Sequence, residues 1–227
     1  LLHIVNGENE GRWRGMPLTT FEEEIYLRAL TGRLVGKALA DLGVNKLAVV
    51  APKNIICSSI AAATEATFIE AGSGVTYHFM VETGANEAEV AERLARFAPQ
   101  VTLLQFGGET PIEEVRRSFV ALLREMASKR VPGDVVVHVR IFAAKGLDEA
   151  LQNPEVREYL RTRNVYVYTV GFDEGKVYIN RIAINEDGSY ALEKIREYQV
   201  TLEHADLLNR SIKNRRLLFQ EAQAQAQ

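Results

Sequence analysis

The 227-residue chain is poor in several residue types that define specialised folds, with one cysteine, one tryptophan and six prolines. One cysteine excludes an intramolecular disulfide and a zinc site built from several thiolates. No apolar run approaches the roughly 18 residues that a membrane-spanning helix needs, so we expect no membrane partner. The net charge of −3, from 27 basic and 30 acidic residues, argues against nucleic acid as a partner.

Short motifs that mark common enzyme classes are also missing. The sequence has no G-x-G-x-x-G after a strand, no G-x-x-x-x-G-K-[ST] and no G-x-S-x-G, which removes the usual support for nucleotide binding and for a serine nucleophile. The chain opens on an apolar, strand-like segment without the basic and apolar regions of a signal peptide. We therefore expect a cytoplasmic location. We predict no metal site, and the sequence leaves any cofactor open.

What the sequence does contain is an alternation of short apolar runs with longer segments of helical period, which is typical of βαβ units and a parallel sheet. This pattern predicts a three-layer α/β fold, in which helices cover both faces of a mostly parallel sheet of about five strands. The five runs are Leu1–Val5, Leu47–Ala51, Val75–Val81, Val101–Phe106 and Val135–Phe142.

Helix boundary signals lie between these runs. Thr20 and Glu23 have the spacing of a capping box and predict a helix from Phe21 to Gly43. The later helices are predicted from Ser58 or Ser59 to Gly72, from Asn86 toward Pro99, from Thr110-Pro111 to Lys129-Arg130, and over Leu147–Leu160 with a break near Asn153-Pro154.

The pattern changes after the fifth run. Val165–Val170 and Lys176–Ile184 flank a turn at Asp173-Glu174-Gly175, which predicts an antiparallel hairpin. Beyond it, an apolar stripe at helical spacing predicts a long helix over 190–220, carrying Ile195, Tyr198, Leu202, Ala205, Leu208, Ile212 and Phe219.

The predicted domain organisation follows from this stripe. A helix of about 28 residues is roughly 42 Å long, more than a domain of this size can cover. We therefore predict a single α/β domain over 1–189, an oligomerisation helix over 190–220 that makes the protein a homo-oligomer, and a disordered tail over 221–227.

Ligands of parallel sheets bind at the edge where the strands end, and the loops expected at that edge are rich in glycine and polar residues. These loops could hold an anion through backbone amides and lysine side chains, although glycine and asparagine also serve simply as turn and cap residues. The candidate ligand-binding residues are Asn6, Lys53, Gly107, Gly108, Thr110 and Lys145.

Four residues are candidates for catalysis. Glu8, Glu82 and Glu109 follow three different predicted strands, so we expect them on one edge, as a carboxylate cluster suited to acid/base work or a divalent cation. Cys57 lies at the start of a predicted helix, where a thiolate is favoured, but a nucleophile there needs a nearby histidine. The alternative is that Cys57 is a small buried apolar residue.

Trp13 stands between two arginines in a loop after the first predicted strand. A core tryptophan rarely has such neighbours, because both guanidinium groups must be paired or reach water. We therefore predict that Trp13 belongs to a ligand-covering or partner-binding loop, outside the core.

The combined pattern predicts an α/β protein that binds a small anionic metabolite at the carboxyl edge of its sheet. A hydrolase, lyase or isomerase activity is compatible with this reading, and whether the protein is an enzyme stays open. The alternative is a non-enzymatic structural or assembly subunit of a homo-oligomer, in which the terminal helix and the Trp13 loop contact other chains.

Overall fold

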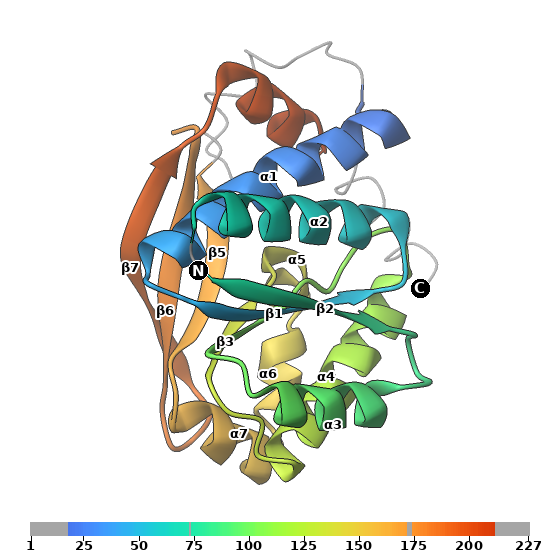
Figure 1. Ribbon diagram of the computed structural model, residues 1–227, viewed down its shortest axis with the longest axis vertical. Helices are drawn as coiled ribbons and strands as arrows, with labels where there is room; N and C mark the ends of the chain where they lie inside the picture. The colour runs from blue at the N-terminus through green and yellow to red at the C-terminus, as the bar shows by residue number, and fades with distance from the viewer. Residues whose placement is uncertain (1–17, 73, 172–173, 212–227) are drawn as a thin grey trace, which may run out of the picture.

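The fold is a seven-stranded sheet between two layers of helices, as the computed structural model shows for residues 18–72, 74–171 and 174–211 (Figure 1). The strand order is β2-β1-β3-β4-β5-β6-β7, with β1 to β5 parallel and the last two strands antiparallel. This arrangement confirms the predicted three-layer α/β class. The predicted strand Leu1–Val5 lies outside the described residues, and the fifth parallel strand is β5.

The elements follow one another along the chain in βα order. The strands are β1 (Lys46–Pro52), β2 (Val75–Val81), β3 (Val101–Leu104), β4 (Asp134–Val137), β5 (Val165–Gly171), β6 (Lys176–Ile184) and β7 (Tyr190–Gln199). The helices are α1 (Phe21–Asp41), α2 (Ile55–Glu70), α3 (Glu87–Phe97), α4 (Ile112–Ser128), α5 (Val139–Ala143), α6 (Gly146–Ala150) and α7 (Pro154–Arg161). A further helical segment over 202–211 is called the 202–211 helix below.

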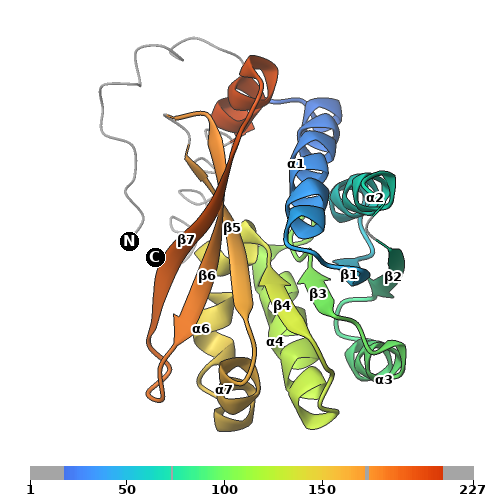
Figure 2. The same cartoon turned by 60° about the vertical axis from the view of Figure 1, so that its left-hand side comes forward.

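Helices α1 and α2 cover one face of the sheet (Figure 2). The predicted capping box starts α1: Thr20 Oγ1 accepts from the Glu23 amide at 3.2 Å, and the Glu23 carboxylate accepts from the Thr20 amide at 2.9 Å. The two helices pack at close range because Gly32 has no side chain. A Cβ there would lie 2.5 Å from the Ile60 carbonyl oxygen.

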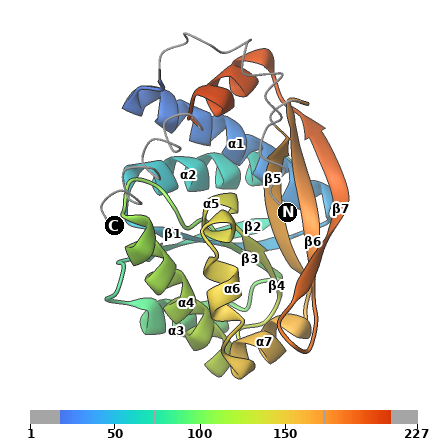
Figure 3. The same cartoon turned by 180° about the vertical axis from the view of Figure 1, so that it is seen from behind.

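Helices α3 to α7 cover the opposite face (Figure 3). Phe106 and Phe119 anchor this layer, with ring centroids 5.6 Å apart in an edge-to-face arrangement. Strands β1, β3 and β4 are buried on both faces and consist largely of apolar residues. None of the helices in the described part of the chain is long and apolar enough to cross a membrane.

Three predicted boundaries were wrong because side chains outside the apolar pattern cap the helices. Helix α2 starts at Ile55, before Ser58, because Asn54 accepts a hydrogen bond from the third amide of the helix. The run predicted as one strand over Val135–Phe142 ends at Val137, because His138 caps α5. Thr110 does not cap α4; its hydroxyl accepts from Asn54 instead.

The helix predicted over 190–220 was also wrong in its first half, which is strand β7. A β-bulge opposite Ile179/Asn180 changes the pairing register along this strand. Tyr190 packs with the α3 to α7 layer, whereas Ile195 and Tyr198 pack with the α1 and α2 layer. The apolar residues therefore lack the two-residue alternation of a regular strand, and their spacing imitates a helix.

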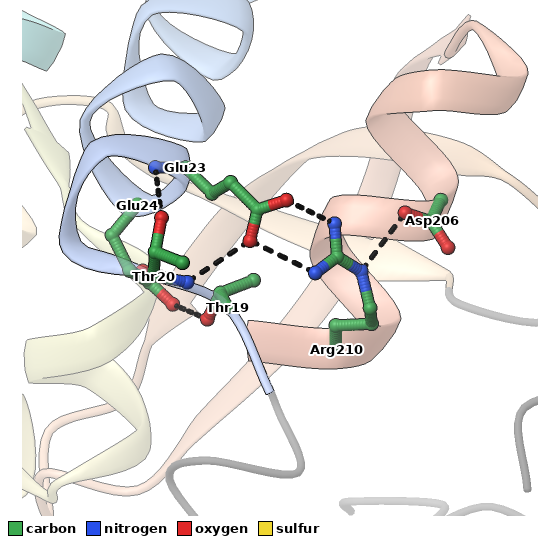
Figure 4. Close-up of polar contacts among 6 residues, drawn as sticks. All are labelled: Thr19, Thr20, Glu23, Glu24, Asp206 and Arg210. Atoms are coloured by element: carbon green, nitrogen blue, oxygen red, sulfur yellow. Dashed lines mark hydrogen bonds and ion pairs between the residues drawn. The ribbon is translucent and has the colours of Figure 1, made fainter. Parts of the chain in front are cut away.

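The 202–211 helix packs on α1, where Leu207 and Leu208 contact Leu27. Arg210 fixes this contact, because its guanidinium group donates to both carboxylate oxygens of Glu23 at 2.9 and 2.6 Å and to Asp206 at 3.0 Å (Figure 4). Leu207 and Leu208 thus belong to the core of this chain, whereas Leu202 is 87% exposed, so oligomerisation through this helix stays a prediction. Ile212, Phe219 and the tail over 221–227 lie outside the described residues.

Candidate functional site

The candidate site lies where the strand order changes direction. From β1 the chain enters α2 on one face of the sheet, and from β3 it enters α4 on the other face (Figure 1). The loops after these two neighbouring strands therefore separate at the carboxyl edge, which is where open parallel sheets bind ligands.

Asn54 joins the two loops. Its Oδ1 accepts from the Cys57 amide at 2.7 Å, and its Nδ2 donates to the Gly107 carbonyl oxygen at 3.2 Å and to Thr110 Oγ1 at 3.1 Å. Gly108 permits this approach, because it has a φ of +80° and a Cβ there would lie 2.2 Å from Asn54 Oδ1. The Arg140 side chain donates to the Gly108 carbonyl and holds the loop from the other side.

Glu109 places its carboxylate on the first amides of α2. Oε1 accepts from the Ile55 amide at 2.6 Å, and Oε2 accepts from the Ile56 amide at 3.1 Å. The first amides of a helix have no partner within it and carry partial positive charge. The first two amides of α2 thus each donate to one oxygen of a single carboxylate, which belongs to the loop after β3.

A shallow depression of about 510 Å³ opens beside this carboxylate. Its lining residues are Lys53, Asn54, Ile55, Ser58 and Ser59. The Lys53 ammonium lies 3.0 Å from a carboxylate oxygen of Glu82, and the Ile55 side chain is 56% exposed. The depression therefore offers a cation, two hydroxyls and an apolar surface to a small molecule.

The structure brings most of the predicted site residues to this edge, namely Lys53, Cys57, Glu82, Gly107, Gly108, Glu109 and Thr110. Lys145 is not among their contacts; it precedes α6 and lies 3.8 Å from Asp148. Asn6, Glu8 and Trp13 lie outside the described residues, so their roles stay predictions.

Glu82 and Glu109 share the carboxyl edge, but each has a different partner: Lys53 for Glu82, and the α2 amides for Glu109. Within 18–72, 74–171 and 174–211, no three histidine, cysteine, aspartate or glutamate side chains form a group that could hold a metal ion.

Cys57 has the environment of an unreactive thiol. Burial raises its pKa to about 11, so the thiol is protonated at neutral pH. No histidine in the described part of the chain forms a hydrogen bond with it. His78 instead contacts Glu65 at 3.3 Å, and His138 accepts from the Arg140 amide.

A row of polar side chains that sequence reasoning missed crosses the sheet next to these loops. Gln105 and His138 directly follow β3 and β4, and Tyr168 lies on β5; all three stand one residue beyond the paired residues Leu104, Val137 and Val167. They face the layer of α1 and α2, and all three are buried. We call these three residues the polar row.

The members of the polar row contact one another. Tyr168 donates to Gln105 Oε1 at 3.3 Å, and the rings of Tyr168 and His138 meet edge to face with centroids 5.3 Å apart. Burial, together with the positive charges of Arg28 and Arg140, lowers the pKa of His138 well below its usual value. The only sequence signal was that Gln105 and His138 are polar residues inside two apolar runs.

A family model described as "uncharacterized protein" matches residues 24–207. The chain belongs to this family. No curated protein matches the chain.

Solved structures show similarity in fold. One is the solute binding protein of an ABC transporter from Rhodopseudomonas palustris BisB5 in complex with 3,4-dihydroxybenzoic acid, at 10% identity and a TM-score of 0.51, covering 78% of this chain and 66% of that one. Another is a solute binding protein from R. palustris in complex with benzoate, at 11% identity and a TM-score of 0.47, covering 74% and 62%.

A third is a candidate branched-chain amino acid ABC transporter protein from Rhodospirillum rubrum, at 17% identity and a TM-score of 0.42, covering 61% of this chain and 36% of that one. The chain thus spans between about one third and two thirds of the length of these proteins. At these identities the likeness concerns the fold.

Proposed function

We propose that the protein binds a small organic carboxylate at the depression beside α2. The observation that carries this proposal is that the Glu109 carboxylate accepts hydrogen bonds from the Ile55 and Ile56 amides beside an open depression. A carboxylate of a ligand can make the same two hydrogen bonds once Glu109 moves aside, because the donors are fixed backbone groups.

The rest of the depression suits the remainder of such a ligand. Lys53 supplies a positive charge near the carboxylate, Ser58 and Ser59 can hydrogen bond, and the exposed Ile55 side chain offers an apolar surface. The shared fold with a solute binding protein that holds 3,4-dihydroxybenzoic acid supports a ligand of this size and charge. A cytoplasmic location stays a prediction.

Binding without catalysis is the form of the function that the site favours. Cys57 and His138 do not form a nucleophile and base pair, because no hydrogen bond joins them and burial raises the pKa of the Cys57 thiol to about 11. The alternative of an assembly subunit has less support, since the apolar stripe is divided between β7 and a helix packed on α1, although Leu202 of that helix is 87% exposed. Self-association stays an untested prediction.

The experiment that tests the proposal is chemical rescue of Glu109→Ala. Removing this carboxylate leaves the α2 amides without their partner, so we expect a lower thermal midpoint than in the wild type. Benzoate or 3,4-dihydroxybenzoate at millimolar concentration should restore part of it, and calorimetry should show at least tenfold tighter binding than to the wild type, because the internal competitor is gone.

Glu87→Ala is the matched control. The Glu87 carboxylate also accepts from a backbone amide, that of Gly84 at 2.6 Å, but Glu87 is buried and does not line the depression beside α2. Its loss should not be rescued by benzoate. Lys53→Ala in the Glu109→Ala background should weaken binding several-fold. Equal rescue of both glutamate variants, or of neither, rules the proposal out.

A further inference from the structure

The polar row contains a buried hydrogen-bond donor without an acceptor. Gln105 Nε2 has no partner although Gln105 is fully buried. His138 Nδ1 accepts from the Arg140 amide at 3.0 Å, which leaves the proton of the neutral ring on Nε2. No residue among 18–72, 74–171 and 174–211 accepts from that Nε2 in a hydrogen bond.

Two cations and two carboxylates surround the row. Arg28 is 7% exposed and acts electrostatically on both His138 and Tyr168, and Arg140 also acts on His138. The Glu24 carboxylate lies 2.9 Å from Arg28, and Glu24 and Glu109 act electrostatically on Arg140. Tyr168 directs its hydroxyl hydrogen to Gln105 Oε1, so it leaves the Gln105 amide hydrogens free.

An unpaired buried donor costs about 1–3 kcal/mol, so the Gln105 amide points to a missing acceptor. A small oxyanion only accepts, and a buried guanidinium group nearby favours its negative charge.

We propose that Gln105 Nε2 and His138 Nε2, together with Arg28, form a second binding site that takes a single small oxyanion such as formate or the carboxylate tip of a larger ligand. This site goes beyond the depression at α2: it lies on the sheet face beneath α1, on the other side of the Gly107-Gly108 loop from Asn54. It neither requires Glu109 to move nor uses Lys53.

The test compares anions at constant ionic strength. Replacing chloride by formate, from 1 to 100 mM, should raise the thermal unfolding midpoint of the full chain progressively, because a ligand of the folded state stabilises it by mass action. Benzoate distinguishes the source of the carboxylate: an effect of formate alone indicates a free anion, whereas a benzoate effect that survives Lys53→Ala indicates a ligand tip.

The decisive variants are Gln105→Leu and Gln105→Glu. Both remove the amide donors, and Gln105→Glu also adds a negative charge. Both should lose the formate response at least tenfold in apparent affinity. Gln105→Glu keeps an acceptor for Tyr168, so it provides a reading if Gln105→Leu folds poorly.

Thr102→Val is the matched control. Thr102 Oγ1 is another buried polar atom without a partner, but it lies on the opposite face of the sheet, level with Ala48 and Val135. This variant should keep the full formate response. A wild type that responds to formate and chloride alike, or a Gln105→Leu variant with an unchanged response, overturns the proposal. Failure of the Glu109→Ala rescue does not affect this outcome.

Discussion

The two ends of the sheet carry depressions of nearly equal size that differ in how their polar groups are paired. The depression at the amino edge measures about 500 Å³ and that at the carboxyl edge about 510 Å³. The residues that line the first are Gly133, Asp134, Arg161, Thr162, Arg163 and Asn164. Volume therefore does not distinguish a binding site from a surface dip in this protein.

At the amino edge the chain satisfies its own polar groups. Arg163 donates to the carbonyl oxygens of Tyr159, Val131 and Gly133 at 2.6 to 2.9 Å, and Asp134 accepts from the Asn164 amide and side chain at 2.9 and 3.1 Å. Near the carboxyl edge, Gln105 Nε2 stays unpaired and the Glu109 carboxylate covers the α2 amides. The proposed binding sites therefore lie at the end where polar groups are less completely paired by the chain itself.

The largest expected change in stability comes from removing the hydrogen bonds that Arg163 makes at the amino edge. Arg163→Met removes three donors from backbone carbonyls and the stacking of the guanidinium group 3.5 Å over the Tyr159 ring. We expect a loss of about 3 kcal/mol in the free energy of unfolding, at about 1 kcal/mol for each hydrogen bond. Denaturant unfolding measures it.

Ligand binding provides the control for this variant. The rescue of Glu109→Ala by benzoate should persist in the Arg163→Met background, because the two edges share no contacts. If Arg163→Met instead costs less than about 1 kcal/mol and changes carboxylate binding, the assignment of structure to one edge and function to the other is wrong.

The second prediction concerns pH. Burial lowers the pKa of His204 from 6.5 to about 4, and burial lowers that of His138 in the same direction, with Arg28 adding to both effects. The unfolded chain therefore binds more protons than the folded chain below about pH 6.5. Stability should fall as the pH is lowered from about 6.5 to about 4, by about 2 kcal/mol from His204.

His204→Gln isolates this contribution. Thr31 Oγ1 donates to the Leu27 carbonyl at 3.0 Å, so His204 Nε2 must donate to Thr31 across their 3.0 Å contact, and a glutamine amide can replace that donor. The variant should lose part of the acid-side slope in unfolding measurements between pH 7 and 4. A parallel Arg163→Met measurement should keep the full slope, since no histidine lines the amino-edge depression.

Features that depend on local sequence patterns could be predicted from the sequence, whereas features that depend on contacts between distant residues could not. The layers, the parallel direction of most strands and the loops at their carboxyl edge follow from apolar runs and cap residues, which act over a few neighbours, whereas the strand order does not. Lys53, Gly107 and Glu109 were found because they follow strands. That Glu109 binds the α2 amides depends on a contact between positions 54 residues apart, which no local pattern contains.

Neither the polar row nor strand β7 was predicted from the sequence, and the two reasons are related. Gln105 and His138 each interrupt an apolar run once, and only the strand register makes them neighbours. The bulge in β7 and the division of its apolar residues between two layers removed the period of two that identifies a strand. In both cases the missing information was the pairing of distant strands.

The smallest expected effect compares two buried tyrosines, one for each end of the sheet. Tyr159 donates to the Val131 carbonyl at 2.8 Å beside the amino edge, whereas Tyr168 donates to Gln105 at 3.3 Å in the polar row. Tyr159→Phe should cost about 1 kcal/mol, the value of a well-formed buried hydrogen bond. Tyr168→Phe should cost less than about 0.5 kcal/mol, because its hydrogen bond is longer and therefore weaker. Chemical denaturation of both variants under identical conditions decides the matter, with chloride as the only added anion. A Tyr168→Phe cost equal to or above that of Tyr159→Phe means that the row is as fully paired as the amino edge, and the distinction between the two ends then fails.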